Sequence, residues 1–240
     1  MLASVHQPIY LPWQPYFGKI ASSDVFVFLD DVQYPGGKGF FNRNCIKGVN
    51  GSILLTAPVT GRSERLSVKD QALSTDVGWQ KKHWKSIVSS YAKAKFFPDY
   101  SPPIQGFFLD QDWVKFSDMA VAFIKLICDL MHIQTRLYLA SELVVAPQTG
   151  LGHILELLDA CGADAYLSGT GEGSMRYMDV DSYKDKGIVL HWHEYVQRPY
   201  PQLWGAYAPD LCILDLLFNR GPQALEELLN CSNTRVQNAT

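Results

Sequence analysis

The sequence predicts an α/β fold of the Rossmann-like class: a mostly parallel sheet with a β-hairpin addition and a helical insertion. Two observations lead to this prediction. Short apolar runs typical of buried strands alternate along the chain with segments of helical spacing, a pattern characteristic of parallel sheets. In addition, Asn50-Gly51 is a turn signal between two further strand-like segments, which indicates a hairpin.

The beginning of the chain reads as a βαβ unit with a proline-rich loop. Residues 3–5 form a short strand, and Pro8, Pro12 and Pro15 then impose extended or turn geometry. Pro15 suits the start of a short helix over residues 16–23. The apolar run 24–29 is a second buried strand, which we expect to be parallel to the first.

The following elements are expected from spacing and turn residues. The hairpin strands lie at 40–46 and 53–59. Helices are expected at 78–93, capped by Asp76 and ended by Pro98, Pro102 and Pro103, and then at 114–131, 149–160, 180–186, 213–218 and 223–229. Further strands are expected at 136–139, 163–167 and 188–195.

These elements predict one domain over residues 1–230, with a helical lobe at about 76–132. Residues 231–240 are polar and are expected to form a frayed tail.

The amino-acid composition argues against several kinds of binding partner and structural site. The 240 residues carry a net charge of −3, so a non-specific grip on nucleic acid or anionic lipid is not expected. The five cysteines are scattered without a Cys-x-x-Cys pair, which argues against a disulfide framework or structural zinc site and favours a cytoplasmic location. No apolar stretch is long enough to span a membrane. We expect a small-molecule substrate and no metal or cofactor.

The loop after the first strand is the strongest candidate for a site. His6 and Gln7 stand at the carboxyl end of that strand, where open α/β sheets bind ligands. A neutral histidine can accept a proton from a hydroxyl, an amine or water. Aromatic and basic side chains follow in the loop and helix: Tyr10, Trp13, Tyr16 and Lys19. The aromatic rings can stack on a sugar or base, or they can simply pack the loop onto the core.

Five other segments carry polar groups. Asp30 and Gln33 follow the second strand; strand alternation lets only one of Asp30 and Asp31 face a given site, and we favour Asp30. The triplet Asn42, Arg43 and Asn44 lies on a hairpin strand, so its members face two sides. The remaining candidates are Ser168 and Gly169 in a glycine-rich turn, the pair His191 and His193, and Gln202 in a proline-rich loop.

Three of these segments also have a purely structural interpretation. The aspartates can stabilise a turn, the hairpin triplet can form an exposed polar face, and the glycines can form a plain turn. The two histidines share a strand face and can chelate zinc or copper, but the sequence offers no third ligand.

Several segments in combination resemble the WbqC-like protein family. They are HQPIYLPWQPYFGKI, SDVFVFLDDVQY, FNRNCIKG and GADAYLSGTG, and the resemblance extends from about His6 to Gly221. It implies that the family's motif residues carry over to the following positions: His6, Gln7, Tyr10, Trp13, Tyr16, Lys19, Asp30, Gln33, Asn42, Arg43, Asn44, Ser168, Gly169 and Tyr177. Relatives tend to have basic residues near the positions of Gln148 and Gly152, and this chain does not.

The resemblance implies a transferase of bacterial surface polysaccharide (O-antigen) synthesis. We expect it to move an acyl or aminoacyl group onto the amine of a nucleotide-linked amino sugar. His6 would be the general base, Asp30 would orient hydroxyls, and Lys19 or Arg43 would steady phosphate or an oxyanion.

Two alternatives stay open. The same residues can serve a non-catalytic carbohydrate- or nucleotide-binding protein of a biosynthetic complex. A nucleotidyltransferase-like enzyme ranks third, because its His-x-Gly-His motif is replaced here by Trp13-Gln14-Pro15-Tyr16.

Overall fold

A computed structural model describes residues 1–36, 39–61, 65–75, 78–175 and 178–237. Its strands are β1 (Leu2–His6), β2 (Val25–Phe28), β3 (Arg43–Gly48), β4 (Gly51–Thr56), β5 (Arg136–Leu139), β6 (Ala165–Gly169), β7 (Val189–Tyr195) and β8 (Ser232–Val236). Its α-helices are α1 (Gln14–Ala21), α2 (Trp79–Tyr91), α3 (Phe97–Leu109), α4 (Phe116–Leu130), α5 (Gly150–Ala160), α6 (Glu172–Met175), α7 (Val180–Asp185), α8 (Ile213–Arg220) and α9 (Ala224–Cys231). Two short 3₁₀ helices are η1 (Ala140–Glu142) and η2 (Gly221–Gln223).

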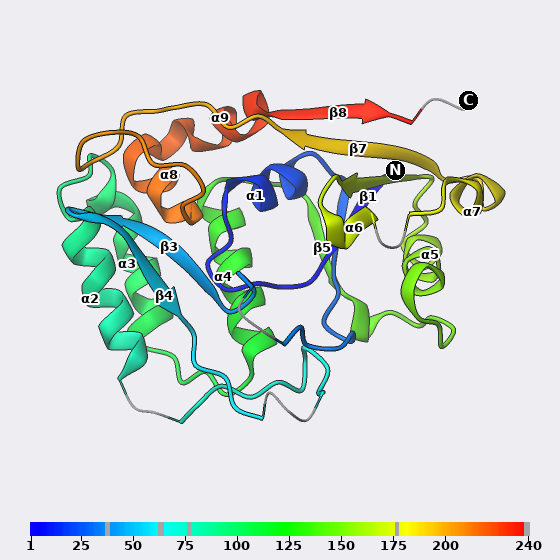
Figure 1. Cartoon of the computed structure of the whole chain (residues 1–240), viewed down its shortest axis with the longest axis horizontal. Coiled ribbons are helices and arrows are strands. Elements are labelled where there is room, and N and C mark those ends of the chain that lie inside the picture. The colour runs from blue at the N-terminus through cyan, green and yellow to red at the C-terminus, as the bar shows by residue number, and fades with distance from the viewer. Residues whose placement is uncertain (37–38, 62–64, 76–77, 176–177, 238–240) are drawn as a thin grey trace.

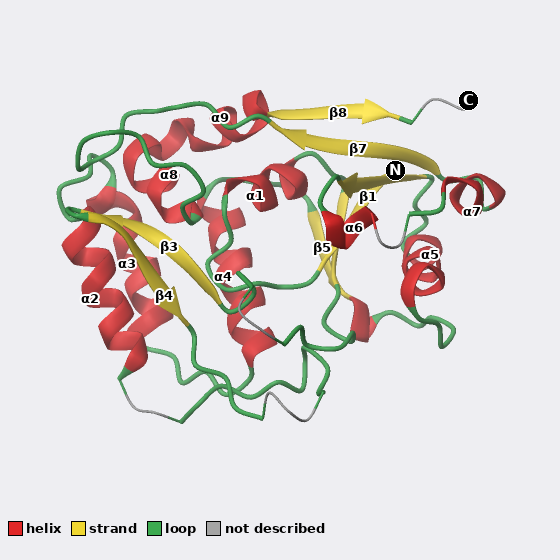
Figure 2. Ribbon diagram, in the orientation of Figure 1, coloured by secondary structure: helices red, strands yellow, loops and turns green. Residues whose placement is uncertain are grey.

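The predicted α/β class is confirmed. A six-stranded sheet has the order β5-β2-β1-β6-β7-β8, in which only the β7–β8 pair is antiparallel, and β3 and β4 form a separate two-stranded sheet (Figure 1). The predicted βαβ unit is also confirmed, because β1 and β2 pair in parallel from Ala3–Val25 to His6–Phe28. Figure 2 shows the separate hairpin sheet beside the helices α2 and α3.

The central strands are buried on both faces, which explains their continuous apolar sequences. Phe26 and Phe28 of β2 pack into a large hydrophobic cluster with residues of α1, α4 and α8. Val25 and Val27 point to the other face and pack with residues of α5 and α7. The sheet therefore has two faces, which we call the α1 face and the α5 face.

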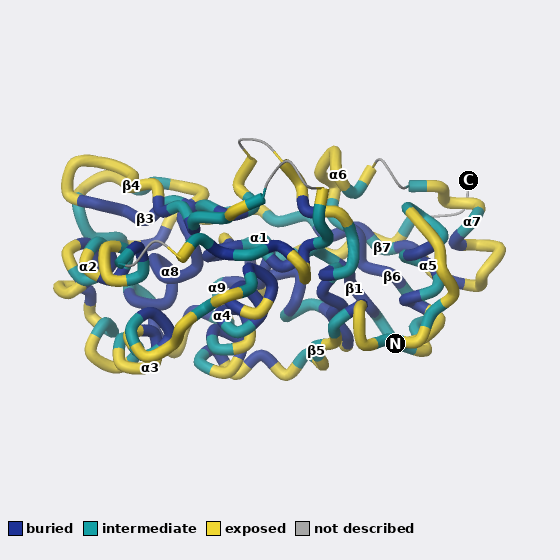
Figure 3. The backbone as a smooth tube through the Cα atoms, turned by 90° about the horizontal axis from the view of Figure 1, so that it is seen from below, coloured by how far each residue is buried: buried dark blue, intermediate teal, exposed yellow. Residues whose placement is uncertain are grey.

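The predicted hairpin is confirmed, but its two-residue turn is Val49-Asn50, one residue earlier than the expected Asn50-Gly51, because Gly48 pairs with Gly51. Gly51, with a φ of 120°, begins β4. Its two strands differ in exposure: β3 is largely buried and β4 is largely exposed (Figure 3). The reason is that β3 packs against α2 and α8. Residues 40–42, expected to belong to the first hairpin strand, precede it.

Two expectations differ from the structure. Pro98, Pro102 and Pro103 do not simply end the preceding helix, because all three lie within α3. Pro98 occupies its first turn, where a missing N–H costs little, and the buried side chains of Ile104 and Phe108 hold the helix in place. The proposed cap Asp76 lies outside the described residues.

The polar C-terminal segment, expected to fray, forms the edge strand β8. It pairs antiparallel with β7 from Tyr195–Ser232 to His191–Val236. Backbone hydrogen bonds to an existing strand fix a polar segment that cannot form a core of its own, and its side chains stay largely exposed. Within the described residues, no helix is long and apolar enough to cross a membrane.

Candidate functional site

The chain changes direction across the sheet between β1 and β6. From β1 it passes to the α1 face and on to β2, which lies beside β1. From β6 it passes to α7 on the other face, where Tyr183 stacks on Tyr166, and on to β7. In open α/β sheets such a switch point, at the carboxyl ends of the strands, is where ligands bind.

The two strands at this switch point separate toward their carboxyl ends. Their register covers only Leu2–Ala165 and Ala3–Tyr166. By contrast, β1 stays paired with β2 up to His6, and β6 stays paired with β7 up to Gly169. We call the region between residues 4–6 and 167–169 the β1–β6 wedge.

Lys19 reaches into this wedge from α1. Its Nζ donates a hydrogen bond of 2.9 Å to the carbonyl oxygen of Val5. The carbonyl groups of Leu2 and His6 accept bonds from the β2 side, so the alternate carbonyl of Val5 faces β6. Continued pairing would give that carbonyl the amide of Gly169 as a partner. The ammonium group thus takes the place of a backbone donor, and its burial lowers the pKa of Lys19 to about 8.

His6 ends β1 beside the wedge and is partly exposed. Its Nδ1 lies 2.8 Å from the carbonyl oxygen of Gln7, and its ring meets the edge of Tyr16 at 5.0 Å. Burial, and then the positive charge of Lys19, lower the pKa of His6 to about 4. At neutral pH the ring is therefore uncharged. Since a carbonyl can only accept, Nδ1 carries the proton and Nε2 keeps its lone pair.

His193 approaches the same region from β7, where it is paired with Gly169. The side chain is buried, and its Nε2 has no hydrogen-bond partner among the described residues. Burial, and then the charge of Lys19, lower the pKa of His193 to about 4. Lys19 therefore influences both imidazoles electrostatically. As for metals, the described residues contain no group of three or more His, Cys, Asp or Glu side chains arranged to hold an ion.

The two aspartates after β2 have different partners. Asp30, which we favoured, is buried and accepts hydrogen bonds from the amide and hydroxyl of Ser141, at 3.0 and 2.6 Å. Its carboxylate thereby fixes the turn after β5. Asp31 instead pairs with Nε2 of His153 at 3.0 Å. His153 was not among the residues predicted from the sequence, although its position in the first turn of the helix before β6 indicates that it lies near the carboxyl edge of the sheet.

The aromatic residues of the loop differ in exposure. Tyr10 is fully buried, and its hydroxyl lies 2.7 Å from Nδ1 of His83. Tyr16 is also buried and donates a hydrogen bond of 3.1 Å to the carbonyl oxygen of Gln7. Trp13, at the start of α1, is 40% exposed. Of these three rings, only the indole presents a surface on which a ligand ring can stack.

The three residues of the hairpin triplet have different surroundings, and of the three only Arg43 and Asn44 belong to β3. Asn42 donates a hydrogen bond of 2.7 Å to the carbonyl of Ala57, and Asn44 donates one of 2.7 Å to the carbonyl of Leu11. Leu11 has a φ of 47°, which bulky residues rarely adopt, so Asn44 helps to hold a strained loop. Nε of Arg43 is buried without a partner in the described part of the chain.

The glutamines and the glycine-rich turn complete the set of predicted residues. Gln7 and Gln33 meet through a side-chain contact of 3.5 Å to the Gln33 carbonyl. Ser168 is buried, and its hydroxyl contacts the carbonyl of Gly169 at 3.2 Å. Tyr177 lies outside the described residues.

Gln202 belongs to a buried polar network away from the wedge. Its Nε2 donates to Asp215 at 2.8 Å, and its Oε1 accepts from Lys47 at 3.0 Å. The hydroxyls of Tyr91 and Tyr200 also donate to the Asp215 carboxylate, at 3.0 and 2.7 Å. Burial raises the pKa of Asp215 despite these bonds. The amide of Gln202 is thus engaged by the protein itself.

The positions of Gln148 and Gly152, where basic residues are missing, lie next to His153. A Cβ atom at Gly152 would stand 3.1 Å from Oε1 of Gln148. The first turn of α5 is therefore closely packed and uncharged at these two positions.

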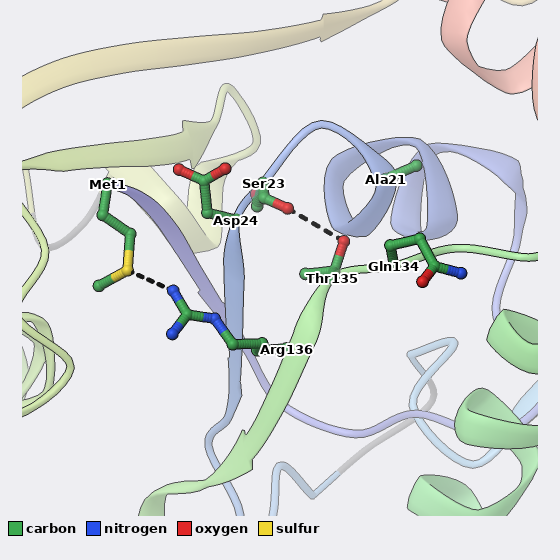
Figure 4. A pocket seen from close by; sticks show the side chains of 7 residues that line it. All are labelled: Met1, Ala21, Ser23, Asp24, Gln134, Thr135 and Arg136. Atoms are coloured by element: carbon green, nitrogen blue, oxygen red, sulfur yellow. Dashed lines mark hydrogen bonds between the residues drawn. The ribbon is translucent and has the colours of Figure 1, made fainter.

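An open cavity of about 580 Å³ lies at the opposite edge of the sheet. Its lining includes Met1, Asp24 and Arg136, which stand at or before the amino ends of β1, β2 and β5 (Figure 4). Arg136 contacts the sulfur of Met1, and Thr135 donates to the carbonyl of Ser23. Because ligands of such sheets bind at the carboxyl edge, the candidate site is the wedge and not this cavity.

Comparisons with known proteins cover almost the whole chain. The sequence profile of the WbqC-like protein family matches residues 7–227. The chain is 30% identical over 229 residues to the uncharacterized protein Rv1507c of Mycobacterium tuberculosis (strain ATCC 25618 / H37Rv), a match that covers 95% of this chain and 97% of that protein. No solved structure matches the chain. The range matched by the profile begins directly after His6 and contains Lys19 and His193.

Proposed function

Since the chain belongs to the WbqC-like protein family, we propose that it is a transferase of bacterial surface polysaccharide (O-antigen) biosynthesis. It moves an acyl or aminoacyl group onto the amine of a nucleotide-linked amino sugar in the cytoplasm. The link to polysaccharide comes from the family resemblance of the motifs. The observation that carries the chemistry is the β1–β6 wedge, where an uncharged His6 and the ammonium group of Lys19 lie together.

The transfer step is a nucleophilic substitution at the acyl carbon. The sugar amine attacks the carbonyl carbon, the new C–N bond forms, and the bond from that carbon to the donor's carrier group breaks. Nε2 of His6 accepts the proton that the amine loses and passes it to the departing carrier. Lys19 provides positive charge for an anionic group of the substrate, a phosphate or the developing oxyanion. Trp13 offers an exposed ring for stacking on the sugar or base.

One observation favours the second candidate, a non-catalytic binding protein of the same biosynthetic complex. The charge of Lys19 opposes protonation of His6, so an imidazolium is costly at this position. A binding site does not require His6 to be protonated, whereas a general base becomes protonated during each turnover.

The substitution His6→Gln separates the two candidates. Transfer is measured by mass spectrometry, as the mass gained by a UDP-linked amino sugar incubated with thioester and aminoacyl donors; binding is measured by calorimetry. For a transferase, turnover falls by about 10²–10⁴-fold while the Kd of the nucleotide sugar changes little. The control His132→Asn, at an exposed left-handed position that asparagine tolerates, leaves both unchanged.

Two results would refute catalysis by His6. If wild-type protein binds the nucleotide sugar but transfers nothing from either donor class, the protein is a binder. If His6→Gln retains full turnover, another residue takes the proton, and His153 beside Asp31 is the next to test.

A further inference from the structure

Lys19 is a buried cation without a counter-charge. Its side chain is 6% exposed, and no carboxylate of the described residues lies within ion-pair distance of its Nζ. Its one hydrogen bond in the described structure goes to Val5, so two of its three donors are left over. A buried charge is costly unless it is paired. The fold thus holds an ammonium group in a place where an anion would be stabilised.

His193 supplies a second unsatisfied group next to it. Its Nε2 is buried without a partner in the described structure, although buried polar atoms are nearly always hydrogen-bonded. The neutral ring can carry its proton on Nε2 and donate it. The ring of His193 lies 6.2 Å from that of Tyr195, whose hydroxyl donates to Oε1 of Gln14 in α1 at 3.0 Å, so His193 lies on the α1 face with Lys19. After burial, the charge of Lys19 is the next cause that lowers the pKa of both His193 and His6. β6 lies between β1 and β7 and ends in Gly169, where a Cβ atom would stand 3.3 Å from Oγ of Ser174.

We propose that Lys19 and His193 together bind a phosphoryl group at the β1–β6 wedge, and leave His6 free to handle the proton. Three donors, two on the amine and one on the imidazole, suit the several oxygens of a phosphoryl group better than the two of a carboxylate. The position also fits, because phosphates of nucleotide ligands bind at the switch point of open α/β sheets. This inference deepens the proposed function: the phosphoryl group is that of the nucleotide-linked sugar.

Calorimetric titration and thermal unfolding test the site with inorganic phosphate and with UDP. Sodium chloride at equal ionic strength is the control for screening, and acetate distinguishes a phosphoryl site from a carboxylate site. Wild-type protein should bind phosphate and UDP and unfold at a higher temperature in their presence, with no effect of acetate. The variants Lys19→Met and His193→Gln should each weaken UDP binding about ten-fold or more. The exposed Lys125→Met should bind as wild type does.

NMR on the wild-type protein tests the same site without relying on variants that could misfold. The imidazole resonances of wild-type protein are followed by NMR during the phosphate titration, with those of His193 and exposed His132 assigned from single substitutions. His193 should shift with saturation and His132 should not.

Binding of acetate as tight as that of phosphate would overturn the assignment to a phosphoryl group. If phosphate raises the unfolding temperature no more than chloride does, the proposed site is wrong. The same holds if a folded Lys19→Met protein binds UDP as tightly as wild type. These outcomes are independent of the transfer assay: phosphate binding without transfer refutes the transferase alone, and transfer without phosphate binding at these residues refutes this site alone.

Discussion

Lys19→Met is expected to change the pH dependence of stability in a direction that the wedge geometry fixes. Burial lowers the pKa of Lys19 from 10.5 to about 8 in the folded protein. At about 1.4 kcal/mol per pKa unit, the buried charge costs about 3 kcal/mol. The cost is fully present below pH 8, where both folded and unfolded chains hold the proton. Between pH 8 and 10.5 only the unfolded chain holds it, so wild-type stability rises with pH.

Methionine removes that cost but also removes the donor to the Val5 carbonyl. An unpaired buried carbonyl costs about 1–3 kcal/mol at every pH. At pH 7 the two effects oppose one another, so the variant should be between equally stable and about 2 kcal/mol more stable than wild type. At pH 10, half a unit below the unfolded pKa, about 1 kcal/mol of the charge cost remains, so the variant should be between equally stable and about 2 kcal/mol less stable than wild type. The stability of the variant relative to wild type should therefore fall by about 2–3 kcal/mol between pH 7 and pH 10.

Urea unfolding followed by tryptophan fluorescence at pH 7, 8, 9 and 10 measures both proteins. The difference between them cancels the titration of tyrosines and cysteines that they share. His6 and His193 do not contribute, because their pKa values of about 4 leave them uncharged throughout. Lys125→Met should parallel wild type at each pH. A constant difference between Lys19→Met and wild type from pH 7 to 10 would refute the buried, charged amine and, with it, the argument for an anion.

Two further substitutions test the packing of the helical region away from the wedge. Asp215→Ala should lower the free energy of unfolding, measured in urea, by about 3–5 kcal/mol, because it removes the hydrogen-bond partner of two buried tyrosine hydroxyls and of Gln202. A loss under about 1 kcal/mol would contradict the importance of this network. Gly221→Ala should cost more than about 1 kcal/mol, because Gly221 has a φ of 52° and a Cβ there would stand 2.5 Å from Phe96. Gly171→Ala, in open space, should cost under about 1 kcal/mol, and equal losses at the two glycines would contradict the steric argument.

The sequence was most informative where one local signal determines an element. The apolar run before Asp30 became β2 because both of its faces are buried, and Asn50-Gly51 marked a hairpin whose turn, Val49-Asn50, begins one residue earlier. It was misleading where a tertiary contact overrides a local preference. Proline signals within α3 were outweighed by the burial of Ile104 and Phe108, and the polar residues of β8 are held by the backbone of β7.

The sequence indicated candidate site residues but not which groups their side chains contact. His6 and Lys19 stood out from their place after a strand, whereas the separation of β1 from β6 depends on two strands far apart in the chain. Likewise, alternation predicted that Asp30 and Asp31 face different ways, but it could not say which of them meets an imidazole. That depended on Ser141 and His153, which belong to distant elements.

The carboxyl edge of the sheet has opposite electrostatic character on its two faces. On the α1 face, His6 lies beside the positive charge of Lys19. On the α5 face, His153 lies beside the negative charge of Asp31. An anionic group is therefore stabilised on the first side and an ammonium or imidazolium on the second. An amino sugar linked to a nucleotide carries both kinds of group on one molecule, so this polarity can orient it across the edge. It follows that Lys19→Met should weaken binding of UDP and of UDP-linked amino sugar alike, whereas Asp31→Asn should weaken only the amino sugar; equal effects of Asp31→Asn on both ligands would contradict this orientation.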